Sequence, residues 1–232
     1  ELYVIKAISD LSEYGVGSAN NGGGSDGQEF TFAAVSANAG DYIYLSSDSA
    51  TFNQWFGFNA AYITSAVNIN GDDAMELFYQ SNVIIENCTF EYNLCEDAIN
   101  LVQSNFTFSN SSVRNTYSDG LDSDFCSGTI LNSTFKSTGN DCIDLSGSIV
   151  DIKGCAVTNA GDKGISGGEN SFVKVDDTKI NKAKTAIASK DLSTVTVNSV
   201  ILQNVDYGFV AFQKKPEFGP AKIIVTNAME GF

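Results

Sequence analysis

The sequence predicts an all-β chain: a small antiparallel β-sandwich followed by a right-handed parallel β-helix of about six coils. The helix is predicted by a stretch of about 22 residues that recurs six times after Ser81. Its units span 81–103, 104–126, 127–147, 148–169, 170–191 and 192–213. A repeat of this length is typical of stacked architectures, in which each unit buries its apolar face against its neighbours.

Each unit contains three short apolar segments, which predict three strands per coil. The first alternates β-branched residues, as in Val83 and Ile85, with the period of a strand that has one buried face. The third segment pairs a small residue or cysteine with a larger apolar one, as in Ala98-Ile99. The second segment has one apolar residue at its centre, namely Phe90, Val113, Phe135, Val157, Ile180 and Ile201 in successive units. No window keeps a helical period, which excludes an all-helical solenoid.

The first 78 residues do not follow this repeat and predict a separate domain. A glycine-rich run at 20–27 reads as an exposed loop, and alternating segments such as 30–32 and 42–45 flank it. This pattern favours an antiparallel, immunoglobulin-like sandwich. We therefore expect two domains, a β-sandwich at 1–78 and a parallel β-helix at 79–232.

Both predicted domains resemble known families. The blocks 14–32, 39–58 and 68–78 resemble the lamin tail domain, an immunoglobulin-like module of secreted microbial proteins. The repeat region resembles the β-helix of pectate-lyase-like proteins, and it resembles β-helix modules of large microbial surface proteins more closely. The resemblance lies in five segments, 119–125, 139–147, 160–166, 186–195 and 207–221. The resemblance implies an extracellular or cell-surface protein with a structural, scaffolding or adhesive role.

Composition limits the partners. The formal net charge is −15, from 28 acidic and 13 basic residues, which argues against nucleic acid and anionic membrane surfaces. No run of 18 apolar residues occurs, so we expect no membrane insertion. If the sandwich is incomplete, its exposed sheet edge is a template for strand addition. The main prediction is therefore a subunit that assembles with other protein subunits, as a homo-oligomer, filament or sheet.

A column of acidic residues is the candidate metal site. Asp97, Asp119, Asp141 and Asp162 recur at spacings of 22, 22 and 21 residues, and Asp122 and Asp144 form a second pair at the same period. Stacked coils bring such carboxylates within about 5 Å of one another. Their repulsion favours a bridging cation, and Ca²⁺ prefers carboxylate ligands. The alternative is that each aspartate caps its own turn through local hydrogen bonds.

The acidic column also raises an enzymatic alternative. The resemblance implies that polysaccharide lyases of this fold use calcium-binding aspartates with an Arg or Lys base, for which Arg114 and Lys163 are the candidates. Related hydrolases use two or three aspartates as acid and base. The aspartates recur with the period of the fold, as a structural ladder would, and the chain has no histidine. We therefore expect a chain that is not an enzyme; the alternative is a calcium-dependent polysaccharide-binding module or a polysaccharide lyase or hydrolase.

Two further residue types need an interpretation. Four asparagines lie in glycosylation sequons, namely Asn87, Asn105, Asn110 and Asn132. We expect glycans there if the host is a eukaryote, although a repeat rich in Asn, Ser and Thr also produces such triplets by chance. The cysteines, among them Cys126, show no zinc-ligand spacing, and we interpret them as small buried hydrophobic residues.

Overall fold

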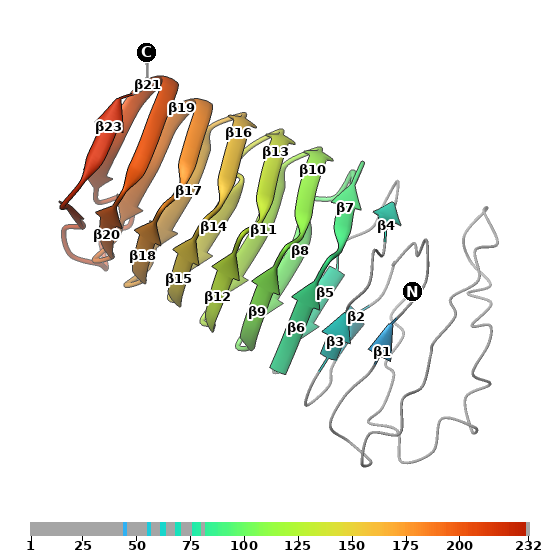
Figure 1. Ribbon diagram of the computed structural model, residues 1–232. Helices are drawn as coiled ribbons and strands as arrows, with labels where there is room; N and C mark the ends of the chain where they lie inside the picture. The colour runs from blue at the N-terminus through green and yellow to red at the C-terminus, as the bar shows by residue number, and fades with distance from the viewer. Residues whose placement is uncertain are drawn as a thin grey trace, which may run out of the picture.

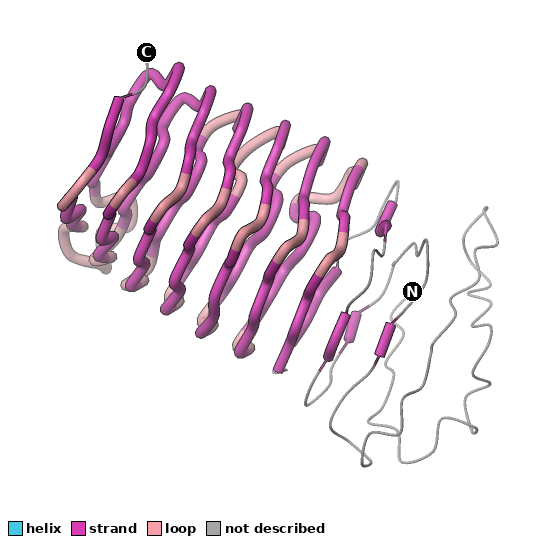
Figure 2. Tube along the Cα trace, viewed as in Figure 1, coloured by secondary structure: helices cyan, strands magenta, loops and turns pink. Residues whose placement is uncertain are grey.

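Residues 44–45, 55–56, 61–63, 68–70, 76–79 and 82–230 are described by the structure, a computed structural model. Within them the chain forms a parallel β-solenoid of the right-handed type with about six turns, as predicted. Figure 1 shows the strands of successive coils stacked side by side along one axis. Figure 2 shows how short loops separate the strands within each coil.

One long ladder follows the first strand of every coil. Its order is β1-β3-β6-β9-β12-β15-β18-β20-β22, and we refer to it as sheet A. The strands are β1 (Tyr44–Leu45), β3 (Ala61–Ile63), β6 (Asn82–Glu86), β9 (Asn105–Ser109), β12 (Ser127–Leu131), β15 (Ile149–Lys153), β18 (Phe172–Asp176), β20 (Thr194–Asn198) and β22 (Lys222–Val225). Each pairs in parallel with its equivalent one coil away, for example Ile130 with Ile152.

Sheet B contains two ladders that merge. The first runs through β2 (Trp55–Phe56), β5 (Glu76–Tyr79), β8 (Asp97–Val102), β11 (Asp119–Asp124), β14 (Ile143–Ser146) and β17 (Lys163–Gly168). The second runs through β4 (Asn68–Asn70), β7 (Thr89–Glu91), β10 (Ser112–Thr116), β13 (Thr134–Thr138) and β16 (Ala156–Ala160). Both join at the long strand β19 (Lys179–Lys190), which pairs with β21 (Val200–Phe212), and β21 with β23 (Ala228–Glu230).

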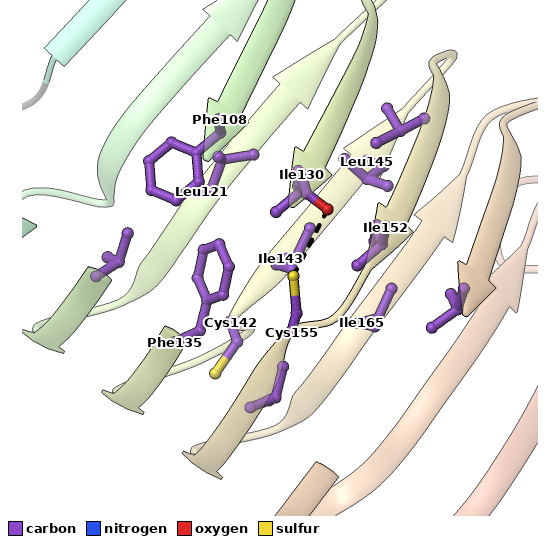
Figure 3. Close-up of a cluster of buried hydrophobic side chains, with 14 of the residues drawn as sticks. Phe108, Leu121, Ile130, Phe135, Cys142, Ile143, Leu145, Ile152, Cys155 and Ile165 are labelled. Carbon is purple, nitrogen blue, oxygen red and sulfur yellow. Dashed lines mark hydrogen bonds between the residues drawn. The ribbon is translucent and has the colours of Figure 1, made fainter. Parts of the chain in front are cut away.

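Inward-facing side chains fill the centre of the coils. In sheet A strands such as β6 and β15, every second residue is buried, as the sequence alternation predicts. The rings of Phe90, Phe108 and Phe135 follow one another along the axis, with centroids 6.1 and 5.7 Å apart. Figure 3 shows Phe108 and Phe135 with Leu121, Ile130 and Ile143 in this core. Burial of these rings is the main stabilising contribution of the core.

The corner that precedes each sheet A strand contains a column of small polar side chains. The backbone amide of Ser104 donates to Sγ of Cys126, and the amide of Cys126 donates to Oγ of Ser148. The next two steps repeat this bond, from the amide of Ser148 to Oγ of Ser171 and from the amide of Ser171 to Oγ of Ser193, each at 2.9 Å. Cys126 is therefore a hydrogen-bonding member of a corner column, and its interpretation as a small hydrophobic residue is incomplete.

The strands before Asn82 extend the same ladders. β3 pairs in parallel with β6, β4 with β7, and β5 with β8. The rest of the sandwich predicted for 1–78 lies outside the described residues, and the boundary at residue 79 stays a prediction. Among the residues that the structure describes, we find no helix with the length and hydropathy of a membrane span.

Candidate functional site

The outer face of β8, β11, β14 and β17 carries two polar columns, which together we call the carboxylate face. The first column contains Asp97, Asp119 and Asp141, and Lys163 continues it one coil beyond Asp141. The second contains Asn100, Asp122, Asp144 and Ser166, whose Cα atoms are register partners on neighbouring strands. Because neighbouring strands lie about 4.8 Å apart, each column is a close-packed row of side chains.

The first column is partly structural. The backbone amide of Asp141 donates to Oδ1 of Asp119 at 2.6 Å, and the amide of Lys163 donates to Oδ1 of Asp141 at 2.9 Å. The Lys163 ammonium also donates to both carboxylate oxygens of Asp141, at 3.3 Å each. Asp119 and Asp141 thus each tie their own coil to the next one, through bonds between residues 22 apart rather than the local bonds of the turn-capping alternative.

Asp162 was predicted as the fourth member of this column, and that placement is wrong. It lies one residue before the column position, which Lys163 occupies. Its carboxylate forms ion pairs with Lys163 and Lys184. Burial by itself would raise the pKa of Asp162, but the two lysines outweigh it and lower the pKa below its ordinary value. Asp162 therefore sits in a different electrostatic environment from the other aspartates.

The two aspartates of the second column have different partners. Nδ2 of Asn100 donates to Asp97 at 2.9 Å and to Asp122 at 3.4 Å. Nζ of Lys190 donates to Asp144, at 3.2 Å from Oδ1 and 3.4 Å from Oδ2. Lys190 is only 8% exposed although it starts two coils away from Asp144.

Gly168 makes the long reach of Lys190 possible. A Cβ atom added at Gly168 would lie 3.1 Å from Cε of Lys190, so the lysine stem lies against the glycine backbone. A side chain at this position would have to displace the lysine. The sequence analysis missed Lys190 because its partner lies 46 residues away. It could have found Asn100 and Ser166, which continue the 22-residue spacing of Asp122 and Asp144 on either side.

Burial raises the pKa of several carboxyl groups on this face. The pKa rises to about 8 for Asp122, about 7 for Asp119 and about 6 for Asp141. Loss of hydration is the largest cause in all three, and repulsion from neighbouring carboxylates adds to it. The pKa values of Asp97 and Asp124 are raised by the same two causes. At neutral pH, a proton on Asp122 relieves part of the repulsion in the columns.

The second column also holds unused hydrogen-bonding capacity. Oδ1 of Asn100 and Oγ of Ser166 are buried, and neither has a hydrogen-bond partner within the described part of the chain. Such groups are uncommon in native proteins, and they cluster at functional sites. Here they lie at the two ends of the row that contains Asp122 and Asp144.

The predicted metal site stays a prediction. Within the described residues, no group of three or more His, Cys, Asp or Glu side chains is arranged to hold a metal ion. Asp119 and Asp141 already accept hydrogen bonds from the backbone, and Asp144 accepts from Lys190. Calcium binding can be tested directly, because a bound ion would make the melting temperature fall in EDTA and recover with added calcium.

The four sequon asparagines are all exposed. Asn87, Asn110 and Asn132 share a corner and have positive φ values of 56, 49 and 48°. Asparagine tolerates this left-handed conformation better than most residues, which gives these three a structural reason to be asparagine. The side-chain Nδ2 of Asn105 donates to Oδ1 of Asn82 at 3.2 Å. Glycosylation at any of the four stays a prediction.

Comparisons with known proteins identify no family. Neither protein-family models nor curated proteins give a match. Among solved structures, tailspike protein 2 of the Escherichia coli O157:H7 bacteriophage CAB120 aligns with a TM-score of 0.37 and 9% identity, over 82% of this chain and 37% of the tailspike. The catalytic unit of a GH87 α-1,3-glucanase from Streptomyces thermodiastaticus aligns with a TM-score of 0.34 and 8% identity, over 82% of this chain and 50% of the glucanase. The chain thus spans half or less of these two structures.

The prediction that the chain is not an enzyme is corrected here. The similar structures include catalytic units of α-1,3-glucanases. The premise of that prediction also fails, because the aspartates do not form a uniform ladder: Asp122 is buried with a raised pKa, whereas Asp144 is paired with Lys190. Similarities of this size decide nothing about the activity of this chain, so the proposal below rests on its own carboxylates.

Proposed function

We propose that the chain binds polysaccharide on the carboxylate face and hydrolyses its glycosidic bonds, with Asp122 as general acid and Asp144 as nucleophile or base. The proposal rests on the difference between these two register partners. Burial holds a proton on Asp122 by raising its pKa to about 8, while Lys190 donates hydrogen bonds to both oxygens of Asp144. A carboxyl group that keeps its proton, beside a second one held by a lysine ammonium group, is the kind of pair that glycoside hydrolysis requires.

The reaction assigns a separate role to each group. The proton of Asp122 passes to the glycosidic oxygen, which leaves as an alcohol with the electron pair of the broken C–O bond. Asp144 either attacks the anomeric carbon, forming a glycosyl ester that water cleaves, or takes a proton from the attacking water. In the first route the water that cleaves the ester passes its proton to Asp122. In the second route Asp144 releases the proton it took to solvent, and Asp122 takes one up from solvent. Both routes consume one water, give a hemiacetal and an alcohol, and return both carboxyl groups to their starting forms.

Hydrolysis is favoured over the lyase alternative because neither candidate base is suitable. Burial opposes protonation of Lys163, but Asp162 and Asp141 raise its pKa above the ordinary value, so it remains an ammonium ion. Arg114 lies on β10, in the other ladder of sheet B, where its Nε donates to Glu91 at 2.6 Å. A lyase needs a basic group that removes a carbon-bound proton, and both of these cations are protonated and occupied.

The proposal is also favoured over the scaffold predicted from the sequence. A scaffold has a use for Asp119 and Asp141, which tie neighbouring coils together, but it gains nothing from Asp122, whose desolvation costs stability at neutral pH. A hydrolytic site needs such groups, since burial tunes their pKa values. Polysaccharide as partner also agrees with the extracellular or cell-surface location that the family resemblance implies. Assembly with other protein subunits remains a prediction from the sequence.

Activity against a panel of soluble polysaccharides tests the proposal. We expect the wild-type chain to release reducing ends from at least one of them. Asp122→Asn and Asp144→Asn should each lower the rate by at least about a hundredfold, since general acid–base catalysis contributes about 10²–10⁴-fold. Asp151→Asn is the matched control, because Asp151 lies on β15 in sheet A and pairs with Lys174 at the surface. Full activity in either test variant, or no activity in the wild type, would contradict the proposal.

A further inference from the structure

The corner that follows β11 holds an aromatic residue in an unfavourable conformation. Equivalent positions in the corners of successive coils lie in the left-handed region, with φ values of 49° at Gln103, 55° at Phe125, 61° at Gly147, 57° at Glu169 and 52° at Asp191. Glycine adopts this conformation freely, whereas a bulky side chain makes it costly. Phe125 is the only aromatic residue among these five positions, and it follows directly after Asp124 of the carboxylate face.

Phe125 is not explained by core packing. Its side chain is 60% exposed, so little of its apolar area is removed from water. Its ring is nevertheless held in a fixed place, because it occupies the space above Gly147. A Cβ atom added at Gly147 would lie 2.5 Å from Cδ1 of the ring. The fold therefore presents an ordered, exposed aromatic ring beside the carboxylates, at a conformational cost that packing does not offset.

Charge at the carboxylate face argues against an anionic ligand. The three lysines that reach this face are each paired with a carboxylate: Lys163 with Asp141, Lys190 with Asp144, and Lys215 with Glu169. None of the three is left to bind the carboxylate of a uronic acid. The neighbouring aspartates would repel such a group further. An uncharged sugar meets neither difficulty, and its C–H groups pack favourably on the electron-rich face of an aromatic ring.

We propose that Phe125 is the stacking platform for one sugar ring of an uncharged polysaccharide bound along the carboxylate face. The inference rests on the proposed function and specifies its substrate class. Asp122 and Asp124 lie on β11, which ends directly before Phe125, so a sugar on the ring would lie at the end of the strand that carries Asp122. Phe125 acts in binding, and the chemistry remains with Asp122 and Asp144.

Phe125→Asn is the informative substitution. Asparagine tolerates the left-handed corner better than phenylalanine, so we expect the variant to melt at the same temperature as the wild type or higher. Loss of binding would then not be a folding defect. Phe172→Asn is the matched control, because Phe172 is 51% exposed and begins β18 in sheet A, on the strand that follows this corner rather than on the strands of the carboxylate face. It removes an aromatic ring of similar exposure from another surface.

Affinity electrophoresis of the full chain in gels that contain one polysaccharide provides the measurement. The probes are dextran, laminarin and hydroxyethyl cellulose as uncharged chains, and polygalacturonate as the anionic one. We expect retardation by at least one uncharged polysaccharide and none by polygalacturonate. Phe125→Asn should weaken that binding about tenfold, which corresponds to about 1.4 kcal/mol, and Phe172→Asn should leave it unchanged.

Each contrary outcome has a distinct meaning. If an uncharged polysaccharide retards wild type and Phe125→Asn equally, the platform is wrong while the proposed function stands. If only polygalacturonate retards the wild type, the substrate class is wrong and the proposed function again stands. If none of the four probes retards the wild type, the proposed function fails, and the platform fails with it.

Discussion

Two aspartates of one column show how environment divides the roles of identical residues. Asp122 and Asp144 are register partners, and both point away from the core. Asp122 is desolvated and accepts hydrogen bonds from the Ser123 backbone amide and from Asn100. A buried lysine instead contacts both oxygens of Asp144. The sequence predicts the column, because its 22-residue spacing is regular. It does not predict the difference, because Lys190 arrives from two coils away across a glycine.

A one-residue error shows a second limit at the same scale. The spacing from Asp141 to Asp162 is 21 residues, and strict continuation of the period would have selected Lys163 instead. That single step exchanges a carboxylate for an ammonium ion in the column. The first three members could therefore be predicted from residue type and spacing. The end of the acidic run depended on the register, which only the structure gives.

Asp122→Asn should stabilise the protein at pH 8 and not at pH 4. The pKa of Asp122 rises from 3.8 to about 8 on folding. Below pH 4 the carboxyl group is protonated in both states, but between pH 4 and 8 the unfolded chain binds fewer protons, so the free energy of unfolding falls as pH rises. Asparagine carries no charge and avoids this loss. Melting temperatures at both pH values, with Asp151→Asn as control, test this; equal shifts at pH 4 and pH 8 would contradict it.

At the scale of the element, the strands were more predictable than the corners. Alternating β-branched residues predicted the sheet A strands, because side-chain direction in a strand follows directly from sequence position. The corners depend on backbone hydrogen bonds between coils, which leave only a weak trace in the sequence. That trace was present as Cys126, Ser148, Ser171 and Ser193, spaced by 22 or 23 residues. Treating cysteine and serine as separate residue types concealed it.

The corner column predicts opposite results for two small substitutions. Cys126→Ser should be nearly neutral, because serine fills the equivalent position in the next three coils and can accept the same bond from Ser104. Ser148→Ala should destabilise by about 1–3 kcal/mol, because it leaves the buried amide of Cys126 without its acceptor. Urea unfolding of both variants provides the comparison. If Cys126→Ser proves the more damaging change, the column does not stabilise the corner through these bonds.

For the molecule as a whole, the repeat determines what the sequence can reveal. Each coil contacts its immediate neighbours, so one recurring unit predicts six coils and their parallel pairing. The segment before residue 79 offers no repeat, and the sequence pattern there supports only a sandwich that the described residues do not test. Function is likewise local in this architecture. A site consists of a few outward residues on adjacent coils, and the same coil scaffold accommodates many different surfaces.

The same one-dimensional architecture predicts how damage to the core spreads. Phe108 is buried between Phe90 and Phe135, so Phe108→Ala should cost about 3–5 kcal/mol. Because coils interact chiefly with their neighbours, the loss should be concentrated near the cavity. Hydrogen exchange should therefore speed up in β9 and β12, while amides of β18 and β20, several coils away, keep their protection. A uniform loss of protection along the axis would show instead that the solenoid unfolds as one cooperative unit.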